Sequence, residues 1–418
     1  MNGRLDTGGH ERRFDVLIVG GFGHVGLPLG ITFADAGLRV ALYDTDASRG
    51  AVVARGEMPF IEHDAEPILR RVLGRTLHIV SDLSTCEEAS TIVITVGTPV
   101  DEYLNPEFGP ILQLADDLCR HLRNGHCIIL RSTVFPGTTE RLSEFLRERG
   151  LAVDVAYCPE RIVQGLAVRE LRTLVQITSG FSPGAVECAR QLFKRLGVET
   201  IEVSVQEAEL AKLFSNAWRY IQFAITNQFY MIATAQGASY ENIYRAMTYN
   251  YPRAQAFPLP GFAAGPCLLK DTLQLAAFYE NHFQLGHAAM AVNEGLPNFI
   301  VGQLRAGGVT LSGARVGILG MAFKAEIDDT RDSLSYKLAK VLRFHGATVL
   351  CSDEYVRDPK FVSKEDLLET CAVVIVGVPH RAYKGLTVRK GAHAVDLWGI
   401  LTKESNTDAE AIGMHAGE

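Results

Sequence analysis

Apolar runs of strand length alternate with longer segments of helical periodicity over most of the chain. The run that starts at Phe14 leads into a glycine-rich turn, and the apolar segments 91–99 and 127–139 also end in Gly, Pro and Thr residues. This alternation predicts an α/β domain with a parallel sheet. In such a sheet, ligands bind beyond the carboxyl ends of the strands.

Residues 204–237 form an unusually long and apolar helical pattern. Ser204 and Glu207 are spaced as a capping box at its start, and Gly237 stands at its end. A helix of about 30 residues is about 45 Å long, which exceeds the edge of one small domain. We therefore expect this helix to connect two domains and to offer a dimer surface.

After residue 306 the pattern of the first strands returns. VGILGMAF resembles VLIVGGFG, ATVLCSDEY resembles RVALYDTD, and AVVIVGVPH resembles TIVITVGTP. The repeat predicts a second nucleotide-binding-like domain with a different ligand, because it lacks the glycine spacing of the first copy. The predicted fold class is α/β, with two Rossmann-like doubly wound domains joined by a long central helix and a helical dimerisation region. The predicted parts are a disordered tail at 1–13, an N-terminal domain at 14–200, a central helical domain at 201–305 and a C-terminal domain at 306–418.

Composition and charge exclude several classes of protein. The 418 residues are 47% hydrophobic and 21% charged, which is typical of a globular chain of two or three domains. The net charge of -7 offers no basic field for nucleic acid or an anionic membrane. No apolar run approaches the ~20 residues of a membrane span, so we expect a cytoplasmic protein. No CxxC pair or metal-ligand spacing is present, so we expect no metal site and reduced core thiols at Cys86, Cys119, Cys127, Cys158, Cys188, Cys351 and Cys371.

The first strand runs into a GxGxxG motif and is followed by a helix. Its three glycines permit a tight turn, a close approach of a pyrophosphate, and close packing of helix on strand. The next strand ends in Asp44, whose carboxylate can accept hydrogen bonds from ribose hydroxyls and would repel a ribose phosphate. The motif therefore predicts NAD as cofactor rather than NADP. The predicted cofactor loop consists of Gly21, Phe22, Gly23, His24, Val25 and Gly26.

Residues after the later strands are candidates for the nicotinamide end of the cleft. Thr98, Thr133 and Gly137 follow predicted strands and should line that end. Ordinary turn chemistry explains the same residues, and for Thr98 both explanations stay open. Glu160 and Arg161 follow another strand, where a carboxylate can polarise water or a substrate hydroxyl and an arginine can bind a phosphate. The alternative is a mutual surface ion pair worth less than about 1 kcal/mol.

One face of the long helix carries polar residues among apolar ones. Glu209, Lys212 and Asn216 follow one another at spacings of three and four. A lysine and an asparagine that project together can stabilise a developing alkoxide, by charge and by an amide donor. The alternative is a solvated stripe on the helix surface.

Cys267 lies in the segment GFAAGPCLLKD, between small residues and the pair Lys270 and Asp271. A helix that starts near this cysteine, and a nearby ammonium group, would both lower the thiol pKa. These are the surroundings of a thiolate nucleophile, whereas a structural cysteine would need neither. A cofactor that accepts hydride and a nucleophilic cysteine together suggest an oxidation through a thioester. In the C-terminal repeat, Lys324 and Arg331 could bind a diphosphate or sugar, restrained by Asp328, Asp329 and Asp332.

The chain from about 14 to 400 resembles the UDP-glucose and UDP-N-acetylhexosamine 6-dehydrogenases, members of the UDP-glucose/GDP-mannose dehydrogenase family. The matching motifs, in family order, are GGFGHVG, STVFPGTT, CPER, AELAKLFSNAWR, PRAQAFPLPGFAAGPCLLKD and MAFKAEIDDTRDS. The resemblance implies two successive oxidations of the sugar's primary alcohol, with two NAD molecules and a uronic acid as product. It also implies a homodimer or higher homo-oligomer.

The resemblance assigns roles to single residues. Cys267 would form a thiohemiacetal and then a thioester, and Lys212 and Asn216 would stabilise the oxyanions. Asp271 would orient water or transfer a proton, while Glu160 would assist hydrolysis. Thr133 would position the water and also contact the cofactor. The other cofactor contacts implied are Lys270 and Arg331, and the other substrate contacts are Arg161, Ile162, Gly261, Gly265, Phe323, Lys324 and, from the neighbouring subunit, Arg253.

Several departures from the family pattern concern the substrate. CPERIVQG has Arg161 and Gln164 where the glucose-specific pattern differs, which favours a UDP-N-acetylhexosamine, whereas the cysteine loop is closer to the glucose branch. Trp398 follows Asp396 and Leu397 where the family often has Asp-Gly-Arg, and Asn227 is followed by Gln228 instead of the usual Glu. UDP-glucose is therefore the alternative substrate. More remote alternatives are a two-electron dehydrogenase of a hydroxy acid or sugar phosphate, and a non-catalytic nucleotide-sugar sensor.

Overall fold

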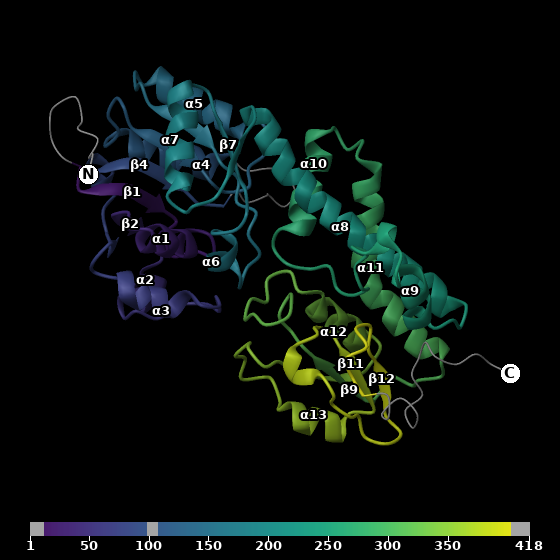
Figure 1. Cartoon of the computed structure of the whole chain (residues 1–418). Helices are drawn as coiled ribbons and strands as arrows, with labels where there is room; N and C mark the ends of the chain where they lie inside the picture. Colours follow the sequence, from purple (N-terminus) through teal and green to yellow (C-terminus); the bar gives the residue numbers. More distant parts are fainter. Residues whose placement is uncertain (1–11, 98–107, 403–418) are drawn as a thin grey trace. The chain divides into compact units, whose positions relative to one another are not determined.

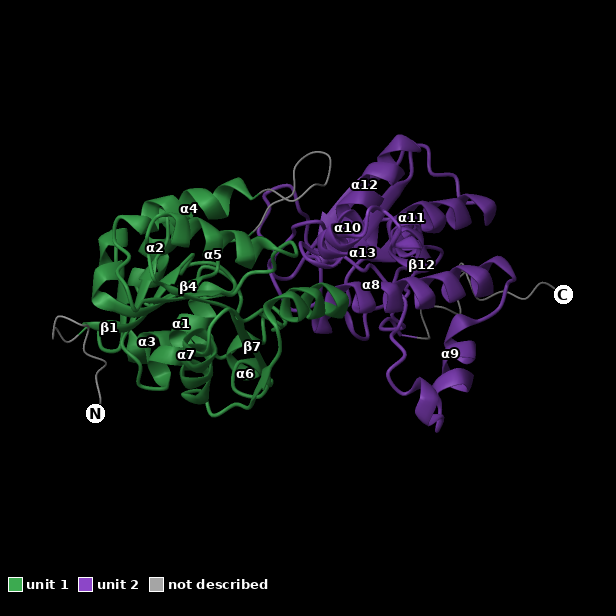
Figure 2. Ribbon diagram, turned by 90° about the horizontal axis from the view of Figure 1, so that it is seen from above, with its two compact units in different colours: residues 1–215 green, residues 216–418 purple. Residues whose placement is uncertain are grey.

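The structure is a computed structural model that describes residues 12–97 and 108–402 (Figure 1). The chain divides into two compact units, one up to residue 215 and one from residue 216, coloured green and purple in Figure 2. Residues 1–11 of the expected tail and the candidate Thr98 lie outside the described residues. Arg12, at the end of that expected tail, donates to the carbonyl oxygens of Ala89 and Ser90.

The first unit contains an eight-stranded sheet in the order β3-β2-β1-β4-β5-β6-β7-β8. Its strands are parallel except for the antiparallel pair β6 and β7. The strand order reverses between β1 and β4, which is where ligands bind in open α/β sheets. The strands are β1 (Phe14–Val19), β2 (Val40–Tyr43), β3 (Leu77–Ile79), β4 (Ala89–Ile94), β5 (Cys127–Leu130), β6 (Asp154–Tyr157), β7 (Gln176–Gly180) and β8 (Thr200–Glu202).

Both faces of this sheet are buried, which explains the continuous apolar sequence of β1. Val16 and Ile18 belong to one apolar cluster, and Leu17 and Val19 belong to another. Since alternate side chains of a strand point to opposite faces, a strand covered on both faces must be apolar at every position. The helices of this unit are α1 (Gly26–Asp35), α2 (Ala47–Ala54), α3 (Ala65–Val72), α4 (Gly109–Cys119), α5 (Thr138–Glu148), α6 (Ala167–Glu170) and α7 (Pro183–Lys194), with a 3-10 turn η1 (Leu83–Glu88).

The predicted long helix is α8 (Val205–Ala235), whose residues belong to both units. Ser204 and Glu207 form the predicted capping box, because the carboxylate accepts from the Ser204 backbone N–H at 2.8 Å and the Ser204 hydroxyl accepts from the Glu207 N–H at 3.3 Å. Gly237 follows the helix with a φ of 68°, which is the left-handed conformation that favours glycine at a helix end.

The second unit contains a four-stranded parallel sheet in the order β10-β9-β11-β12 and a group of helices. Both α8 and this sheet confirm the predicted α/β fold with two Rossmann-like sheets and a long connecting helix. None of the helices in the described part of the chain is both long and apolar enough to cross a membrane. The elements are α9 (Tyr240–Thr248), η2 (Pro252–Ala254), α10 (Leu268–Phe278), α11 (Gln284–Ala306), β9 (Arg315–Leu319), α12 (Leu334–Phe344), β10 (Thr348–Ser352), α13 (Lys364–Thr370), β11 (Val373–Val376), η3 (Arg381–Tyr383) and β12 (His393–Val395).

The cysteines follow the predicted division into core thiols and one reactive candidate. Cys267 is exposed and Cys119 is half-buried. The other six cysteines are buried, and all eight are free thiols. Burial raises the pKa of the Cys86 and Cys158 thiols to about 12, so neither is a thiolate at neutral pH.

Candidate active site

The glycine-rich loop after β1 is shaped for a dinucleotide, with one difference from the prediction. The left-handed turn lies at Gly20, with a φ of 84°, and not at Gly21. Gly21 is required for packing instead, because a Cβ there would lie 2.9 Å from the Cβ of Leu42. A Cβ at Gly26 would lie 2.2 Å from the Gly20 carbonyl oxygen, which confirms the predicted close approach of helix and strand.

Gly23 leaves open space at the start of α1. A Cβ built there would approach the Gly20 carbonyl oxygen at 3.6 Å and no other atom of the described residues within 4 Å. The helix begins three residues later, at Gly26, so its first backbone N–H groups lie beside this space. A helix N-terminus with open space before it suits a pyrophosphate.

Asp44 lies at the end of β2, as the sequence predicts for a residue that binds ribose. Its Oδ2 accepts from the N–H of Phe22 at 2.9 Å and its Oδ1 accepts from the N–H of Asp46 at 3.0 Å. The carboxylate is half-buried and keeps unused lone pairs, since each oxygen accepts a single bond. The open space at Gly23 and this carboxylate fit the pyrophosphate and adenosine ribose of NAD.

His24 joins the glycine-rich loop to the loop that follows β6. Its Nδ1 lies 3.0 Å from Nε2 of Gln164, and its ring lies 3.9 Å from the ring of Phe60. Glu62 also holds the second loop, because its carboxylate accepts from the N–H of Gly165 at 2.9 Å. The cofactor loop and the loop of Glu160 are therefore fixed relative to one another within the first unit.

Glu160 is held in a buried network. Its Oε2 lies 3.0 Å from Nε and 2.6 Å from Nη2 of Arg131, whose side chain is fully buried. The same guanidinium donates to Oε1 of Gln176 at 2.8 Å and to the carbonyl oxygen of Cys158 at 3.1 Å. These contacts make Glu160 an anchored anion rather than a mobile surface group.

The expected alternative of a surface ion pair between Glu160 and Arg161 is wrong. Arg161 donates through its guanidinium to the carbonyl oxygen of Val175, and burial lowers its pKa. Its backbone N–H and that of Ile162 donate to Oε1 of Glu160, at 2.7 and 3.0 Å. The sequence did contain a signal for the real partner, because Arg131 ends the otherwise apolar strand segment CIILR.

The loop after β5 carries Thr133 and is tied to α8 by Glu209. The Glu209 carboxylate accepts from the N–H of Gly137 at 2.7 Å and from the N–H and hydroxyl of Thr139, at 3.0 and 2.6 Å. Burial raises the pKa of Glu209, and these hydrogen bonds oppose that rise. Glu209 thus caps the N-terminus of α5. Lys212 is buried one turn further along α8.

Asn216 and Asp271 form a close pair in the second unit. Nδ2 of Asn216, on α8, donates to Oδ2 of Asp271, on α10, at 2.5 Å. The Asp271 side chain is fully buried, and its Oδ1 lies 3.3 Å from Nζ of Lys270. Three residues of the sequence prediction therefore lie together, and the carboxylate has an amide and an ammonium as partners.

Cys267 occupies the N-cap position of α10 and is exposed. The first turn of the helix closes on it, because the N–H of Asp271 donates to the Cys267 carbonyl oxygen at 2.8 Å. Hydrogen bonding to Asp329 raises the pKa of Arg331, burial opposes this, and the negative charge of a Cys267 thiolate raises it further. By reciprocity the guanidinium favours the thiolate, as does the positive end of the helix dipole.

The small residues before Cys267 leave room for aromatic rings. A Cβ at Gly261 would lie 1.8 Å from the indole ring of Trp398, and a Cβ at Gly265 would lie 2.6 Å from the ring of Phe323. Asn227 fixes the start of this loop, because its Nδ2 donates to the Gly261 carbonyl oxygen at 3.0 Å and its Oδ1 accepts from the Gly261 N–H at 2.8 Å. Sequence reasoning singled out Asn227 and Trp398 but assigned neither of them this structural role.

The loop after β9 presents the remaining candidates of the second unit. Arg331 makes a two-pronged contact with Asp329, at 3.0 and 2.6 Å, so Asp329 restrains it as expected. Phe323 donates its N–H to the Asp329 carbonyl oxygen at 2.9 Å, which folds the loop back next to Lys324. Arg253 lies apart on η2, exposed, with Nη1 3.1 Å from the Tyr251 hydroxyl.

A cavity of about 300 Å³ opens beside the cysteine loop in the second unit. Gly265 lines it together with the first residues of α12 and two lysines that were not predicted, Lys337 and Lys340. Lys337 Nζ lies 2.9 Å from Oε2 of Glu294. A search of the described residues finds no cluster of three or more His, Cys, Asp or Glu that could bind a metal.

Comparison with known proteins identifies the family. Residues 15–197, 206–295 and 317–403 match, in this order, the NAD binding, central and UDP binding domains of the UDP-glucose/GDP-mannose dehydrogenase family. The chain belongs to this family. It is an NAD-dependent nucleotide-sugar 6-dehydrogenase, which confirms the predicted enzyme class, the predicted cofactor and the recognised family.

Relatives of known activity cover nearly the whole chain. The UDP-N-acetyl-D-mannosamine dehydrogenase of Pyrococcus horikoshii is 28% identical over 379 residues, 88% of this chain and 90% of its own length. The UDP-N-acetyl-D-glucosamine 6-dehydrogenase of Pseudomonas aeruginosa is 27% identical over 88% of each chain. Among solved structures, a UDP-glucose dehydrogenase from Pyrobaculum islandicum matches with a TM-score of 0.86 at 25% identity, over 98% of both chains.

Proposed function

We propose that this enzyme oxidises the primary alcohol of a UDP-N-acetylhexosamine to the uronic acid in two oxidation steps. Cys267 would add to the aldehyde from the first step as a thiohemiacetal, the second oxidation would convert this to a thioester, and water would hydrolyse the thioester. The observation that carries the proposal is the setting of Cys267, an exposed thiol at the N-terminus of α10, close enough to the Arg331 guanidinium that a negative charge on its sulfur raises the Arg331 pKa. Six of the other seven cysteines are buried. A thiolate adds readily to an aldehyde and thereby retains the intermediate.

The N-terminal domain supplies the cofactor site. NAD, when bound, accepts one hydride from the sugar carbon in each oxidation, so that two molecules are used for each product. The glycine-rich loop would hold its pyrophosphate, and Asp44 would accept hydrogen bonds from its adenosine ribose. Thr133, Lys270 and Arg331 are the further cofactor contacts that we propose, and Thr98 completes this set.

The chemistry at the sugar carbon needs groups that hold oxyanions and move protons. Lys212 and Asn216 would stabilise the alkoxide and the tetrahedral oxyanions, since an ammonium and an amide N–H both favour developing negative charge. In the last step water attacks the thioester carbon, the carbon–sulfur bond breaks, and the sulfur leaves as the Cys267 thiolate. Asp271 would orient this water or accept its proton, assisted by Thr133 and Glu160.

The loop after β9 and the cysteine loop would bind the UDP-sugar. Lys324 offers an ammonium for a phosphate or sugar oxygen, and the glycines at 261 and 265 let the backbone approach the ligand. Arg161 and Ile162 would contact the sugar from the loop of Glu160. The family's UDP binding domain covers residues 317–403, which supports a uridine diphosphate as the carrier.

Two observations favour an N-acetylated sugar. The relatives from P. horikoshii and P. aeruginosa act on N-acetylated UDP-sugars by their names. Arg161 and Gln164, in the loop of Glu160, also depart from the glucose-specific pattern of the family. UDP-glucose is the second candidate, because the cysteine loop resembles the glucose branch and the similar structure from P. islandicum is a UDP-glucose dehydrogenase.

Initial rates with a panel of UDP-sugars test the substrate assignment. The panel consists of UDP-N-acetylglucosamine, UDP-N-acetylmannosamine, UDP-glucose and UDP-galactose, with NADH absorbance as the readout. We expect kcat/KM for one N-acetylated sugar to exceed that for UDP-glucose by at least about 100-fold, since a site built for an amide rejects ligands without it. A higher kcat/KM for UDP-glucose would assign the enzyme to the glucose branch.

We also propose that the enzyme is a homodimer, or a higher assembly of dimers, formed along α8. Trp218, Ile225, Phe229 and Ile232 are exposed, and at 100° per residue they fall on one side of the helix. Asn216 and Asn227 fall on the opposite, buried side. An apolar stripe of this length is typical of a self-complementary contact between two copies. In such a dimer Arg253 would reach the substrate of the other subunit.

Mixing two inactive variants tests the role of Arg253. Arg253→Ala and Cys267→Ser would be unfolded together, refolded and assayed. If Arg253 acts across the dimer, half of the dimers are mixed and each has one complete site, which restores about a quarter of the wild-type activity. If Arg253 acts within its own subunit, no site is complete and the mixture stays inactive. Light scattering on Ile232→Glu tests the dimer surface itself, because a buried charge would shift the mass toward the monomer.

A further inference from the structure

The two sheets differ at the point where their strand order reverses. This point lies between β1 and β4 in the first unit and between β9 and β11 in the second. In the first unit, Gly23 leaves space there for a ligand. In the second unit, a Cβ at Gly320 would lie 2.6 Å from the Cβ of Val378, and a Cβ at Gly377 would lie 2.8 Å from the Gly320 carbonyl oxygen. The same close packing occurs in the first unit, where a Cβ at Gly20 would lie 2.8 Å from Oγ1 of Thr95. The difference lies at Gly23, because the repeated segment of the second unit has Phe323 at the corresponding position.

Asp353 is the counterpart of Asp44 in the second unit, and its carboxylate is occupied by hydrogen bonds from within that unit. Asp353 follows β10 as Asp44 follows β2. Its Oδ2 accepts from the N–H groups of Met321 and Ala322, at 2.6 and 3.0 Å, and lies 3.2 Å from Nε2 of His380. The first two of these contacts hold the start of the loop after β9.

The other oxygen of Asp353 is also occupied. Its Oδ1 accepts from the N–H groups of Tyr355 and Val356, at 2.8 and 3.0 Å. Burial alone would raise the pKa of Asp353, but hydrogen bonds from His380 and from these backbone groups hold it far below its usual range. With five donors, the carboxylate has no position left for a ribose hydroxyl, whereas Asp44 accepts from two N–H groups of the described residues.

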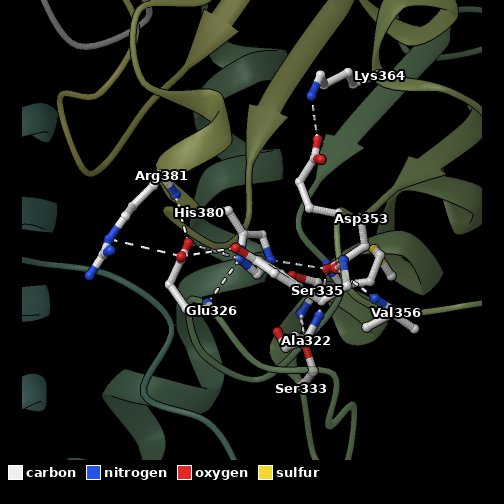
Figure 3. A network of polar contacts seen from close by, with 12 residues as sticks. Ala322, Glu326, Ser333, Ser335, Asp353, Val356, Lys364, His380 and Arg381 are labelled. Atoms are coloured by element: carbon white, nitrogen blue, oxygen red, sulfur yellow. Dashed lines mark hydrogen bonds and ion pairs between the residues drawn. The ribbon is translucent and has the colours of Figure 1, made fainter. Parts of the chain in front are cut away.

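His380 lies between Asp353, which follows β10, and Glu326, in the loop after β9 (Figure 3). Its ring is fully buried, and Nδ1 accepts from the backbone N–H of Glu326 at 3.0 Å. Because Nδ1 accepts, the ring proton lies on Nε2, which donates to Asp353. The imidazole therefore connects the acid after β10 to the middle of the loop that carries Lys324.

Glu326, whose backbone N–H donates to His380, has an unfavourable backbone conformation. Its φ is 64°, in the left-handed region that non-glycine residues seldom adopt. Besides the backbone bond to His380, Glu326 accepts through its carboxylate from the Arg381 N–H at 2.8 Å (Figure 3). The same carboxylate accepts from the Tyr355 hydroxyl at 2.9 Å. Such a conformation persists where the surroundings determine it fully, and here it lies two residues after Lys324.

We propose that Asp353 and His380 are positioning residues that close the switch point of the second sheet and fix the loop 320–333, so that Lys324 is presented to the uridine diphosphate by a preformed loop. In this proposal the switch point of the second sheet holds the loop 320–333 and does not bind a dinucleotide. The proposal rests on the proposed function, because it takes the UDP-sugar as the ligand of this loop. A loop ordered before binding costs no ordering entropy when the ligand arrives.

A comparison of two replacements of His380 tests the proposal. His380→Gln keeps an amide donor for Asp353 and an oxygen acceptor for the Glu326 N–H, although it loses the ring. His380→Phe keeps a ring of similar size but removes both hydrogen bonds. Glu354→Gln is the matched control, because Glu354 pairs with Lys364 at 2.7 Å in the same region without a bond to the loop. Calorimetric titration with UDP and, separately, with NAD measures the binding constants.

We expect UDP to bind His380→Phe at least about tenfold more weakly than wild type, because the Glu326 N–H would be left buried without an acceptor and the loop would move to avoid this. His380→Gln and Glu354→Gln should stay within about threefold of wild type. NAD affinity should be unchanged in all three. A pure packing role for the imidazole predicts the reverse order, with His380→Phe close to wild type and His380→Gln impaired, and that order would overturn the proposal.

Two further outcomes are distinguishable. If wild type fails to bind UDP, the proposed substrate class is wrong, whatever the variants do. If wild type binds UDP but His380→Phe does not fold, Tyr355→Phe replaces it, since it removes one hydroxyl bond from Glu326. This variant should weaken UDP binding about threefold with unchanged NAD binding, and an unchanged UDP affinity would contradict the proposal.

Discussion

Arg131 and Glu160 form a buried ion pair at the carboxyl edge of the first sheet, with Nη2 2.6 Å from Oε2. The arginine is fully buried and the glutamate nearly so. Because the other carboxylate oxygen accepts two backbone N–H groups, Glu160 cannot turn away from its position. Arg131, directly after β5, thereby fixes the orientation of the Glu160 carboxylate in the loop after β6.

Breaking this pair from one side should be costly. Arg131→Met leaves the Glu160 carboxylate buried without its cation, so the free energy of unfolding should fall by about 3–5 kcal/mol. Arg149→Met is the control, because Arg149 pairs with Asp116 at the surface at 2.8 Å and such pairs contribute less than about 1 kcal/mol. Urea denaturation of both variants measures the difference. An equal loss of unfolding free energy in the two variants would show that the buried pair stabilises the protein no more than the surface pair does.

The same pair allows stability and activity to be separated. In the double variant Arg131→Met with Glu160→Gln, the buried charge is gone, so most of the lost stability should return. Product formation should not recover if Glu160 assists hydrolysis as we propose, because its carboxylate is missing. A double variant that regains both would remove Glu160 from the mechanism.

Gly261 should tolerate no side chain as long as Trp398 covers it. Gly261→Ala places a methyl group 1.8 Å from an indole carbon, so either the ring or the cysteine loop must move, at a cost of about 2–4 kcal/mol. Gly295→Ala, on α11, is the control, because a Cβ there meets no atom of the described residues within 4 Å and alanine favours a helix. Thermal denaturation compares the two.

A double-mutant cycle assigns this cost to the tryptophan. In a Trp398→Ala background, the destabilisation caused by Gly261→Ala should be smaller by at least about 1 kcal/mol. If the cost is the same in both backgrounds, the indole ring is not the obstacle. The result also bears on the substrate site, since Trp398 stands where related enzymes often have arginine.

His126 should make the folded protein less stable as the pH falls below neutrality. Burial, together with the charges of Arg12 and Arg123, lowers its pKa to about 4 from the ordinary value of 6.5. Between these two values the unfolded chain binds a proton that the folded chain does not. Stability therefore rises with pH across this window, and on acidification from pH 6.5 to 4 this group alone costs on the order of 3 kcal/mol.

Replacement of His126 by a group that does not titrate tests this dependence. His126→Gln should flatten the slope of unfolding free energy against pH between about 4 and 6.5, even if it lowers stability overall. His63→Gln serves as the control, because that side chain is exposed. A slope that His126→Gln leaves unchanged would mean that the imidazole is protonated in the folded state.

The sequence predicts features that depend on local spacing. The capping box at Ser204 and Glu207, the glycine loop and the repeat of strands follow from residues that are neighbours in the chain or share one periodic pattern. The helix that starts at Cys267 belongs to the same group. Even here the exact turn differs by one residue, because the packing of Gly21 on Leu42 moves the left-handed position to Gly20.

Contacts between distant segments could not be predicted in this way. Arg131 meets Glu160 across 29 positions, and Asn227 meets Gly261 across 34. The apolar segment before Arg131 indicates that its charge needs a partner, but the local sequence does not identify that partner, and the same holds for Asn227. The packing of strands and helices determines both partners. For the same reason Glu209, which the helical pattern groups with Lys212, turns out to cap another helix.

The stoichiometry of NADH to uronic acid, in wild type and in Cys267→Ser, tests the central claim most directly. The account predicts two NADH for each uronic acid from one preferred UDP-sugar in wild type. In Cys267→Ser, the second oxidation should fail to give free product, because an oxygen ester or hemiacetal replaces the thioester route. One NADH per turnover, unchanged by the substitution, would contradict the account and leave a simple two-electron alcohol dehydrogenase on this fold.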